Sequence, residues 1–244
     1  MSNELENKII GSDLCKLAEL LNRFNLCDDV SSLDTAGQHC MYSSSDNSWN
    51  YDLGKIVFKV DEVGGRIPTH SEDFSVSLSV QIAGINKSEE IKNPLSKLIF
   101  NIEIEGIHSE TGSDLYASWH LDEHIFLAGD EKPKYCHPIY HFAFGGEKME
   151  EKRDMFGGCL ILPTPRFAYP PMDAALGIDF ILQNYFHKDK IVEIIHESQY
   201  LEIMQSAQER LWKPYFFSIM SNWDAETYTP ANNFSSKMLF PLFH

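Results

Sequence analysis

The most constraining feature of this sequence is the nine-residue segment from Phe74 to Ile82, in which apolar and polar residues alternate strictly. Successive side chains of a β-strand point to opposite faces of its sheet, so a period of two predicts a strand with one buried and one wetted face. Similar alternation follows at residues 100–105 and 115–122, on either side of a turn sequence at 110–113. Two strands joined by such a turn predict a hairpin, and we expect an antiparallel sheet in the middle of the chain.

A helical pattern precedes this sheet region. Apolar residues recur at helical spacing between residues 12 and 25, where Ser12 or Asp13 can cap the helix and Asn25 can end it. The stretch from about residue 28 to residue 54 is rich in Ser, Asp and Asn. We expect it to form a long loop with room for short strands.

Helical patterns also follow the sheet region. Pro170-Pro171 marks the expected start of a helix that runs to about Tyr185, and its apolar residues on nearly all sides predict that it is buried. Asp189 can cap a further helix, which Lys213-Pro214 ends or kinks. The predicted fold class is therefore α+β: an antiparallel β-sheet with an N-terminal helix and with C-terminal helices packed on one face.

The length of the chain bears on its domain organisation. At 244 residues it is long for one domain and short for two, because single cores rarely grow beyond about 250 residues. We predict one compact domain over residues 1–244, with an N-terminal helix at 12–25, a β-rich middle at 55–162, a helical part at 170–223 and an apolar C-terminal tail at 224–244. The last seven residues are too apolar to stay in solvent, so they either dock on the core or insert into a partner.

Charge and cysteine content exclude several classes of protein. The net charge of −16, from 36 acidic and 20 basic residues, repels nucleic-acid phosphates, so non-specific nucleic-acid binding is not expected. The five cysteines are widely spaced without a C-x-x-C, which fits neither a disulfide framework nor a zinc ribbon. The polar N-terminus is no signal peptide, and the apolar runs fall far short of the ~20 residues that span a bilayer. We therefore expect a soluble, cytoplasmic protein without membrane association.

Four of the ten histidines lie between residues 120 and 141. On a strand, His120 and Asp122 point to one face with Cα atoms about 6.6 Å apart, whereas His137 and His141, if extended, lie about 13 Å apart. If the two segments pair, His120 and Asp122 with one or both of His137 and His141 can line one pocket and hold Zn²⁺, Mn²⁺ or Fe²⁺. His124 can be a further ligand or an ordinary surface histidine. The alternative for the whole set is that these side chains are polar members of a half-buried sheet, hydrogen-bonded to backbone or carboxylates.

Two charged residues further along the chain are candidate catalytic residues. Arg166 can bind a carboxylate or phosphate through two parallel hydrogen bonds, or it can form a structural ion pair in this acidic chain. Asp179 stands among apolar residues of the expected buried helix, so its carboxylate needs a partner, for which Arg166 or a sheet histidine would serve. Asp173 is expected in the first turn of that helix, where the dipole favours an anion. Gly145-Gly146 can let a ligand approach the backbone, although a turn is the commoner reason for such a pair.

The residues from His137 onward also carry a resemblance. The pattern H-P-x-Y-H-x-x-x-G-G, followed by P-R-x-x-x-P-P-M-D-x-x-L-x-I-D-F-I-L-x-N-Y-F, resembles uncharacterised bacterial proteins of mobile and defence-related genomic islands. It covers about residues 119–186 and brings no established activity. It implies a bacterial accessory gene in a multi-gene system, such as antiviral defence, with protein partners encoded nearby. The matching residues are His137, Pro138, Tyr140, His141, Gly145, Gly146, Pro165, Arg166, Pro170, Pro171, Met172, Asp173, Asp179 and Asn184.

Two functions stay open at this point. The favoured one is a non-enzymatic binding or regulatory subunit of a bacterial defence or mobile-island system, because no complete catalytic motif is present. Its tail or first helix would contact a protein partner, and removing residues 238–244 should abolish complex formation without unfolding the domain. The alternative is a metal-assisted hydrolase acting on a nucleotide or phosphodiester. Its proposed residues are the metal ligands His120, Asp122, His137 and His141, the anion clamp Arg166, and Asp179 behind the ligands.

Overall fold

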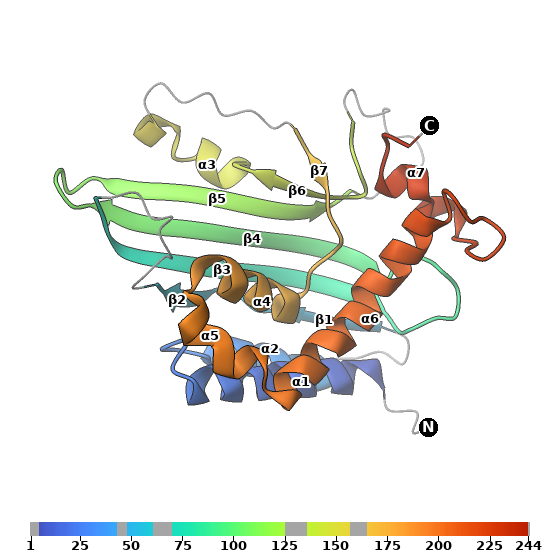
Figure 1. Cartoon of the computed structure of the whole chain (residues 1–244), viewed down its shortest axis with the longest axis horizontal. Helices are drawn as coiled ribbons and strands as arrows, with labels where there is room; N and C mark the ends of the chain where they lie inside the picture. Colours follow the sequence, from blue (N-terminus) through green and yellow to red (C-terminus); the bar gives the residue numbers. More distant parts are fainter. Residues whose placement is uncertain (1–4, 43–47, 61–69, 125–135, 157–164, 244) are drawn as a thin grey trace.

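The computed structural model describes residues 5–42, 48–60, 70–124, 136–156 and 165–243. Its fold class is α+β, as the sequence patterns predict, with an antiparallel sheet, an N-terminal helix and C-terminal helices (Figure 1). In chain order the elements are α1 (Glu6–Arg23), α2 (Ser31–Tyr42), β1 (Ser48–Asp52), β2 (Ile56–Lys59), β3 (Ser71–Ile85), β4 (Leu95–His108), β5 (Asp114–Glu123), β6 (Tyr140–Phe144), α3 (Glu147–Glu150), the 3-10 turn η1 (Arg153–Phe156), β7 (Phe167–Ala168), α4 (Ala174–Tyr185), α5 (Lys188–Ile195), α6 (Ser198–Met220), the 3-10 turn η2 (Asn232–Phe234) and α7 (Ser236–Leu239).

The described strands form one antiparallel sheet in the order β1-β3-β4-β5-β6-β7, with β2 paired to β3 beyond the end of β1. The predicted hairpin is β4 and β5, and its turn contains Gly112 at a φ of +67°, a conformation that glycine adopts without strain. The register pairs Val80 with Phe100 and Phe100 with Leu121. Apolar residues of successive strands therefore share one face, and this face forms the core.

Helix α4 packs on that apolar face. Gly177 is the reason for the close approach, because a Cβ at this position would lie 2.6 Å from the Phe100 ring. Figure 1 shows α4 in front of the sheet, α1 and α2 beside β1, and the long α6 crossing towards α7. The opposite face of β4 and β5 carries polar side chains such as Asn101, Glu103 and His120, since they alternate with the core residues.

The first 54 residues correct two expectations. Helix α1 begins at Glu6, six residues before the predicted start, although Asn25 does end it in the left-handed conformation, at a φ of 52°. The predicted loop contains β1 and also α2, whose buried residues Leu33, Ala36, Gly37 and Cys40 follow helical spacing. Gly37 explains why this polar segment is helical: a Cβ there would lie 2.7 Å from the Gly11 carbonyl oxygen. Tertiary contact with α1 outweighs the loop-like composition.

The C-terminal helices correct three more boundaries. Asp173 lies before α4 as its N-cap, accepting a hydrogen bond from the Leu176 N–H at 3.0 Å, rather than in the first turn. The single helix predicted after Asp189 is two helices, α5 and α6, and the side chain of His187 caps the first. Pro214 does not end α6, because the helix continues to Met220 with buried residues on both sides of the proline.

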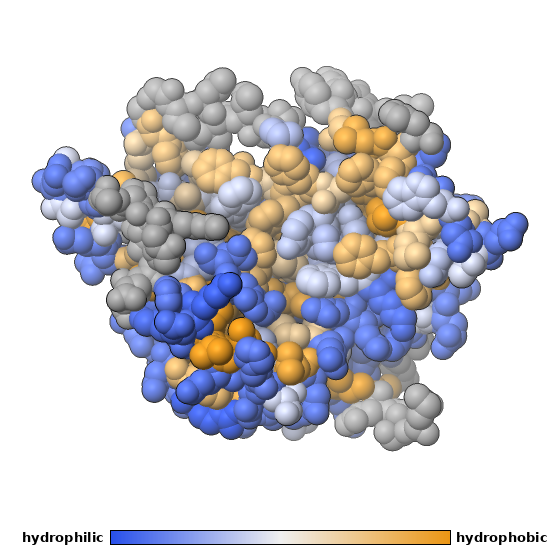
Figure 2. All heavy atoms as spheres, in the orientation of Figure 1, coloured by the Kyte–Doolittle hydropathy of each residue, from blue (hydrophilic) through white to orange (hydrophobic). Residues whose placement is uncertain are grey.

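The C-terminal tail docks on its own chain. Phe234 and Leu239 are fully buried, and the Met238 carbonyl accepts a hydrogen bond from the Ile139 N–H at 3.0 Å. Removing residues 238–244 would therefore uncover the core, and the expectation that such a deletion leaves the domain intact conflicts with this packing. Figure 2 shows apolar side chains gathered around α7.

The sequence also predicts a turn at Gly64-Gly65, a glycine turn at 157–158 and a short apolar strand at 159–162, and all three lie outside the described residues. Residues 147–154, whose charged composition predicts a loop, contain α3 and the first two residues of η1. The described strands begin at Ser48 and end at Ala168, so the β-rich part is wider than the predicted 55–162. Within the described residues, no helix combines the length and apolar composition needed to cross a membrane.

Candidate metal centre

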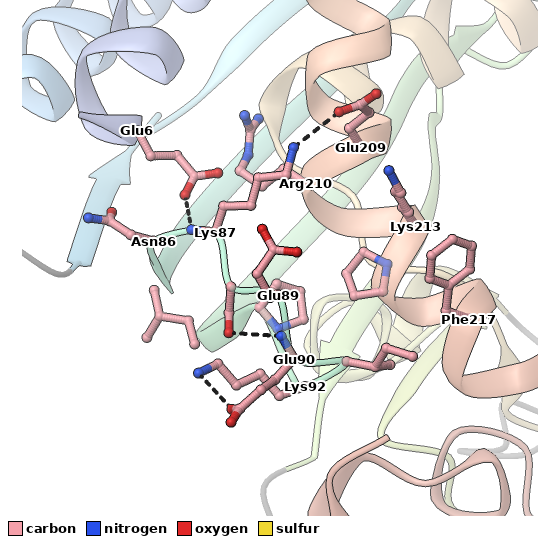
Figure 3. A pocket seen from close by; sticks show the side chains of 15 residues that line it. Glu6, Asn86, Lys87, Glu89, Glu90, Lys92, Glu209, Arg210, Lys213 and Phe217 are labelled. Carbon is pink, nitrogen blue, oxygen red and sulfur yellow. Dashed lines mark hydrogen bonds and ion pairs between the residues drawn. The ribbon is translucent and has the colours of Figure 1, made fainter. Parts of the chain in front are cut away.

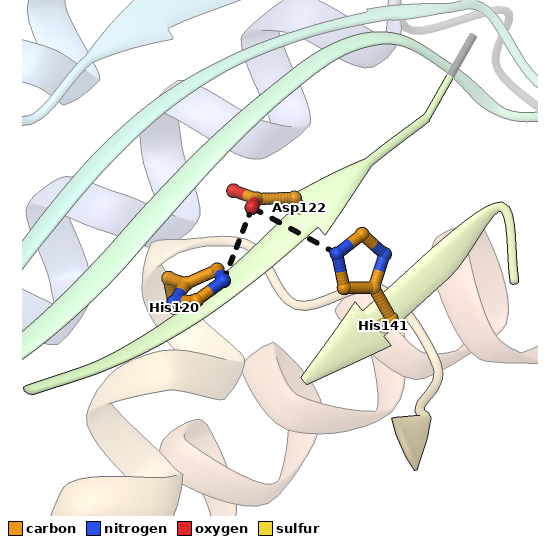
Figure 4. Close-up of side chains that lie close together, drawn as sticks. All are labelled: His120, Asp122 and His141. Carbon is orange, nitrogen blue, oxygen red and sulfur yellow. Dashed lines mark ion pairs between the residues drawn. The ribbon is translucent and has the colours of Figure 1, made fainter. Parts of the chain in front are cut away.

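The two histidine-bearing segments pair in the sheet, as the metal-site hypothesis requires. Strands β5 and β6 are antiparallel neighbours, with Asp122 opposite His141 and His120 opposite Ala143. Strand periodicity therefore places His120, Asp122 and His141 on one face, the face opposite α4. Figure 4 shows the three side chains converging from β5 and β6.

These three residues, which we call the His/Asp cluster, have the spacing of a metal site. The Asp122 Oδ2 atom lies 3.4 Å from His120 Nε2 and 3.9 Å from His141 Nε2. One ligand atom from each residue lies within 4.8 Å of the other two. The Asp122 side chain is 45% exposed and that of His141 only 4%, so the cluster is anchored in the protein and open on one side.

The neutral state of the His141 ring favours binding of a cation by the cluster. Burial, with the charges of His137 and Arg166, lowers the pKa of His141 to about 4, so the ring is neutral near pH 7. Its Nδ1 lies 3.4 Å from the Pro138 carbonyl oxygen. If Nδ1–H donates there, the lone pair of Nε2 faces the Asp122 carboxylate, and two acceptors that face each other need a proton or a metal ion between them.

The pKa of Asp122 responds to two opposing influences. Burial raises it, while the positive charges of His120 and Arg166 lower it. One carboxylate and two imidazoles form a donor set that Zn²⁺, Mn²⁺ and Fe²⁺ accept.

Gly146 supports His120 directly. Its φ is +75°, and a Cβ at this position would lie 2.6 Å from His120 Nδ1. The hydroxyl of Ser118 fixes the preceding residue by donating to the Gly145 carbonyl at 2.7 Å. The glycine pair therefore shapes the pocket of a histidine ring, whereas the sequence suggested a turn or the close approach of a ligand.

His137 lies beside the His/Asp cluster rather than within the set of three. Its ring centroid is 4.9 Å from that of His141 and 4.1 Å from that of His124. The expected extended geometry of residues 137–141 is wrong, because β6 begins only at Tyr140 and the chain bends before it. Burial, with the charges of Arg166 and His124, lowers the pKa of His137 to about 4.

The charge of Arg166 acts on the His/Asp cluster. This residue precedes β7, in which Ala168 pairs with His141, so a period of two places Arg166 on the face of the cluster. Its charge lowers the pKa of Asp122 and that of His141.

Asp179 lies on α4, on the other face of the sheet. The prediction that Arg166 or a sheet histidine is its partner is wrong. Its carboxylate accepts hydrogen bonds from Tyr200 Oη at 2.7 Å and from Gln183 Nε2 at 3.4 Å. The structure therefore does not bring Asp179 together with the histidines, and its catalytic role stays a prediction without a geometric basis.

A second polar cluster escaped the sequence analysis. Arg210 of α6 donates from Nη2 to Asp173 Oδ2 at 2.7 Å, and both side chains are buried. The partners are 37 positions apart in the sequence, so no local sequence pattern predicts the pair.

A cavity of about 180 Å³ lies between α6 and the segment that connects β3 with β4 (Figure 3). Its charged side chains include ion pairs, Lys87 with Glu209 at 3.1 Å and Lys92 with Glu90 at 3.3 Å. Arg210 reaches this cavity but is paired with Asp173. Because these charges compensate one another, the His/Asp cluster is the better candidate for a functional site.

Comparisons with known proteins do not bear on the assignment of the His/Asp cluster as the functional site, which depends on its geometry. No family model, no curated protein and no solved structure matches the chain.

Proposed function

We propose that the protein is a metal-dependent hydrolase that acts on a nucleotide or phosphodiester. The observation that carries the proposal is the convergence of two imidazoles and one carboxylate within 4.8 Å on an open part of the sheet. Three protein ligands leave positions free on a divalent ion for water and substrate. A bound Zn²⁺, Mn²⁺ or Fe²⁺ would lower the pKa of a coordinated water and polarise a phosphoryl oxygen.

Arg166 supports an anionic substrate. The chain carries a net charge of −16, so a phosphate needs local positive charge to approach it. The Arg166 guanidinium shares a face with the His/Asp cluster and is the kind of group that binds phosphate through two hydrogen bonds. His120, Asp122 and His141 would hold the ion, and Arg166 would orient the phosphate beside it.

Hydrolysis of bis(p-nitrophenyl) phosphate, with Zn²⁺, Mn²⁺ or Fe²⁺ added in turn, tests this function. We expect metal-dependent release of nitrophenolate that falls at least tenfold in Arg166→Gln while bound metal is unchanged. Arg23→Gln is the matched control, because Arg23 at the end of the distant helix α1 forms an exposed ion pair with Glu197. Equal rates in Arg166→Gln and the wild type would contradict the assigned role of the guanidinium.

A second candidate is the binding or regulatory subunit of a bacterial defence or mobile-island system. The specific observation in its favour is the apolar surface beside the docked tail, where Trp223 is 71% and Leu242 61% exposed. Exposed apolar groups of this kind mark protein contacts. The test is co-purification with the products of neighbouring genes, using Trp223→Ser with Leu242→Ser, because these changes leave the buried Leu239 in place. Unchanged co-purification would exclude this surface.

A further inference from the structure

The C-terminal tail is hydrogen-bonded to the chain segment that carries His137 and His141. The Ile139 N–H donates to the Met238 carbonyl at 3.0 Å, and the Ile139 carbonyl accepts from the His124 N–H at 2.7 Å. A single residue between the two histidines therefore connects the tail with strand β5.

The same peptide group also faces the ring of His141. The peptide bond between Pro138 and Ile139 contributes its N–H to Met238 and its carbonyl oxygen to the contact with His141 Nδ1, at 3.4 Å. Because a peptide group is planar and rigid, fixing the N–H fixes the direction of the carbonyl. A histidine that binds metal through Nε2 depends on such an acceptor at Nδ1 for its tautomer and orientation.

The tail itself is held by the core and not by the histidines. Phe234 and Leu239 are fully buried, and the Ser218 hydroxyl of α6 donates to the Phe234 carbonyl. Helix α7 packs against α6. The position of the Met238 carbonyl is thus set by contacts that do not involve the His/Asp cluster.

We propose that the C-terminal tail is a positioning element for the metal centre, acting through Met238 and the Pro138–Ile139 peptide on the orientation of His141. The proposal rests on the metal centre proposed above. Its consequence is that tail docking and metal binding are coupled, and coupling between two equilibria is reciprocal. A docked tail raises the affinity for metal, and bound metal holds the tail in place.

A pair of leucine substitutions tests the first direction. Leu239→Ala loosens the tail, and Leu33→Ala creates a comparable cavity beneath α2, since both leucines are 0% exposed. With both variants folded by circular dichroism, we expect Leu239→Ala to weaken Zn²⁺ binding at least tenfold and to alter the visible absorption spectrum of bound Co²⁺. Leu33→Ala should change the affinity less than twofold and leave the spectrum alone. Equal affinities and spectra in the two variants would overturn the proposal.

Hydrogen exchange on the wild-type chain tests the reverse direction without any substitution. Saturating Zn²⁺ should slow exchange of the Ile139 amide and of the amides of residues 238–240 at least fivefold, while the α1 and α2 amides change less than twofold. Bound Zn²⁺ with no added protection of the tail would overturn the coupling and leave the metal centre standing. A wild-type chain that binds no metal would overturn both.

Discussion

Two polar clusters in this protein contain a carboxylate beside nitrogen groups, and they are built in opposite ways. In the first, Asp173 Oδ2 accepts from Arg210 at 2.7 Å while its Oδ1 accepts from the Leu176 N–H at 3.0 Å. In the second, Asp122 lies 3.4 Å and 3.9 Å from imidazole nitrogens, and its side chain is 45% exposed. The carboxylate of the first cluster is fully paired and closed to solvent, whereas that of the second lies beside two imidazoles and is open to solvent.

This difference separates a structural role from a binding role. A buried carboxylate that accepts hydrogen bonds on both oxygens is closed to a ligand, and removing one member of its ion pair leaves a buried charge. An open group of acceptors contributes little to the fold but gains from a metal ion. The comparison predicts that substitutions in the first cluster change stability, and that those in the second change metal binding.

The largest expected effect is on stability, from Asp173→Ala. The change leaves Arg210 buried without its partner and removes the cap of α4, so we expect a loss of about 3–5 kcal/mol in the free energy of unfolding. Urea denaturation measures it. Asp189→Ala is the control, because its side chain is 90% exposed and should cost less than about 0.5 kcal/mol. A cost below about 1 kcal/mol for Asp173→Ala would remove the contrast between the clusters.

The next effect is on the pH dependence of the free energy of unfolding of the metal-free protein. Burial holds the pKa of His141 at about 4 in the folded state, below the ordinary value of 6.5, so the unfolded chain takes up the proton more readily. The stabilisation is complete above pH 6.5 and is lost as the pH falls from 6.5 to 4, by about 3 kcal/mol. Burial raises the pKa of Asp122 in the folded state. Above its ordinary pKa of 3.8, this carboxyl therefore makes the folded state more stable as the pH falls, which is opposite to the effect of His141. Denaturation across this window should show a flatter profile in His141→Gln, and an unchanged slope would contradict the assignment.

A smaller effect, confined to metal affinity, is expected for Gly146→Ala. The new Cβ would lie 2.6 Å from His120 Nδ1 and would displace the ring, weakening Zn²⁺ binding about 10–100-fold. Gly112→Ala is a matched control, because Gly112 also has a positive φ, +67°, but its Cβ would meet nothing within 4 Å. Calorimetric titration of both variants separates backbone strain from the contact with His120. Equal loss of affinity would mean that strain alone is responsible.

Local periodicity was sufficient for much of the sheet. The alternation of Phe74–Ile82 and the turn before Asp114 predicted β3, β4 and β5, because a half-buried strand determines its side-chain pattern residue by residue. Pairing of the segments carrying His120 and His141 was the condition for a metal site, and the structure meets it.

The remaining features depend on contacts that sequence periodicity does not report. Helix α2 forms because Gly37 fits against α1, although its composition is that of a loop. His137 approaches His141 because the chain bends before β6, where an extended segment would separate them. Asp179 accepts a hydrogen bond from Tyr200, and Asp173 pairs with Arg210, which lies far along the chain. Each of these depends on tertiary packing between distant segments.

The most direct test of the account is elemental analysis of the purified chain without a histidine tag, beside the double variant His120→Ala, His141→Ala. We predict about one Zn, Mn or Fe per wild-type chain and none in the variant, with both proteins folded by circular dichroism. An absence of metal from the wild type, also after incubation with each ion, would contradict the metal centre and leave the His/Asp cluster as part of the sheet.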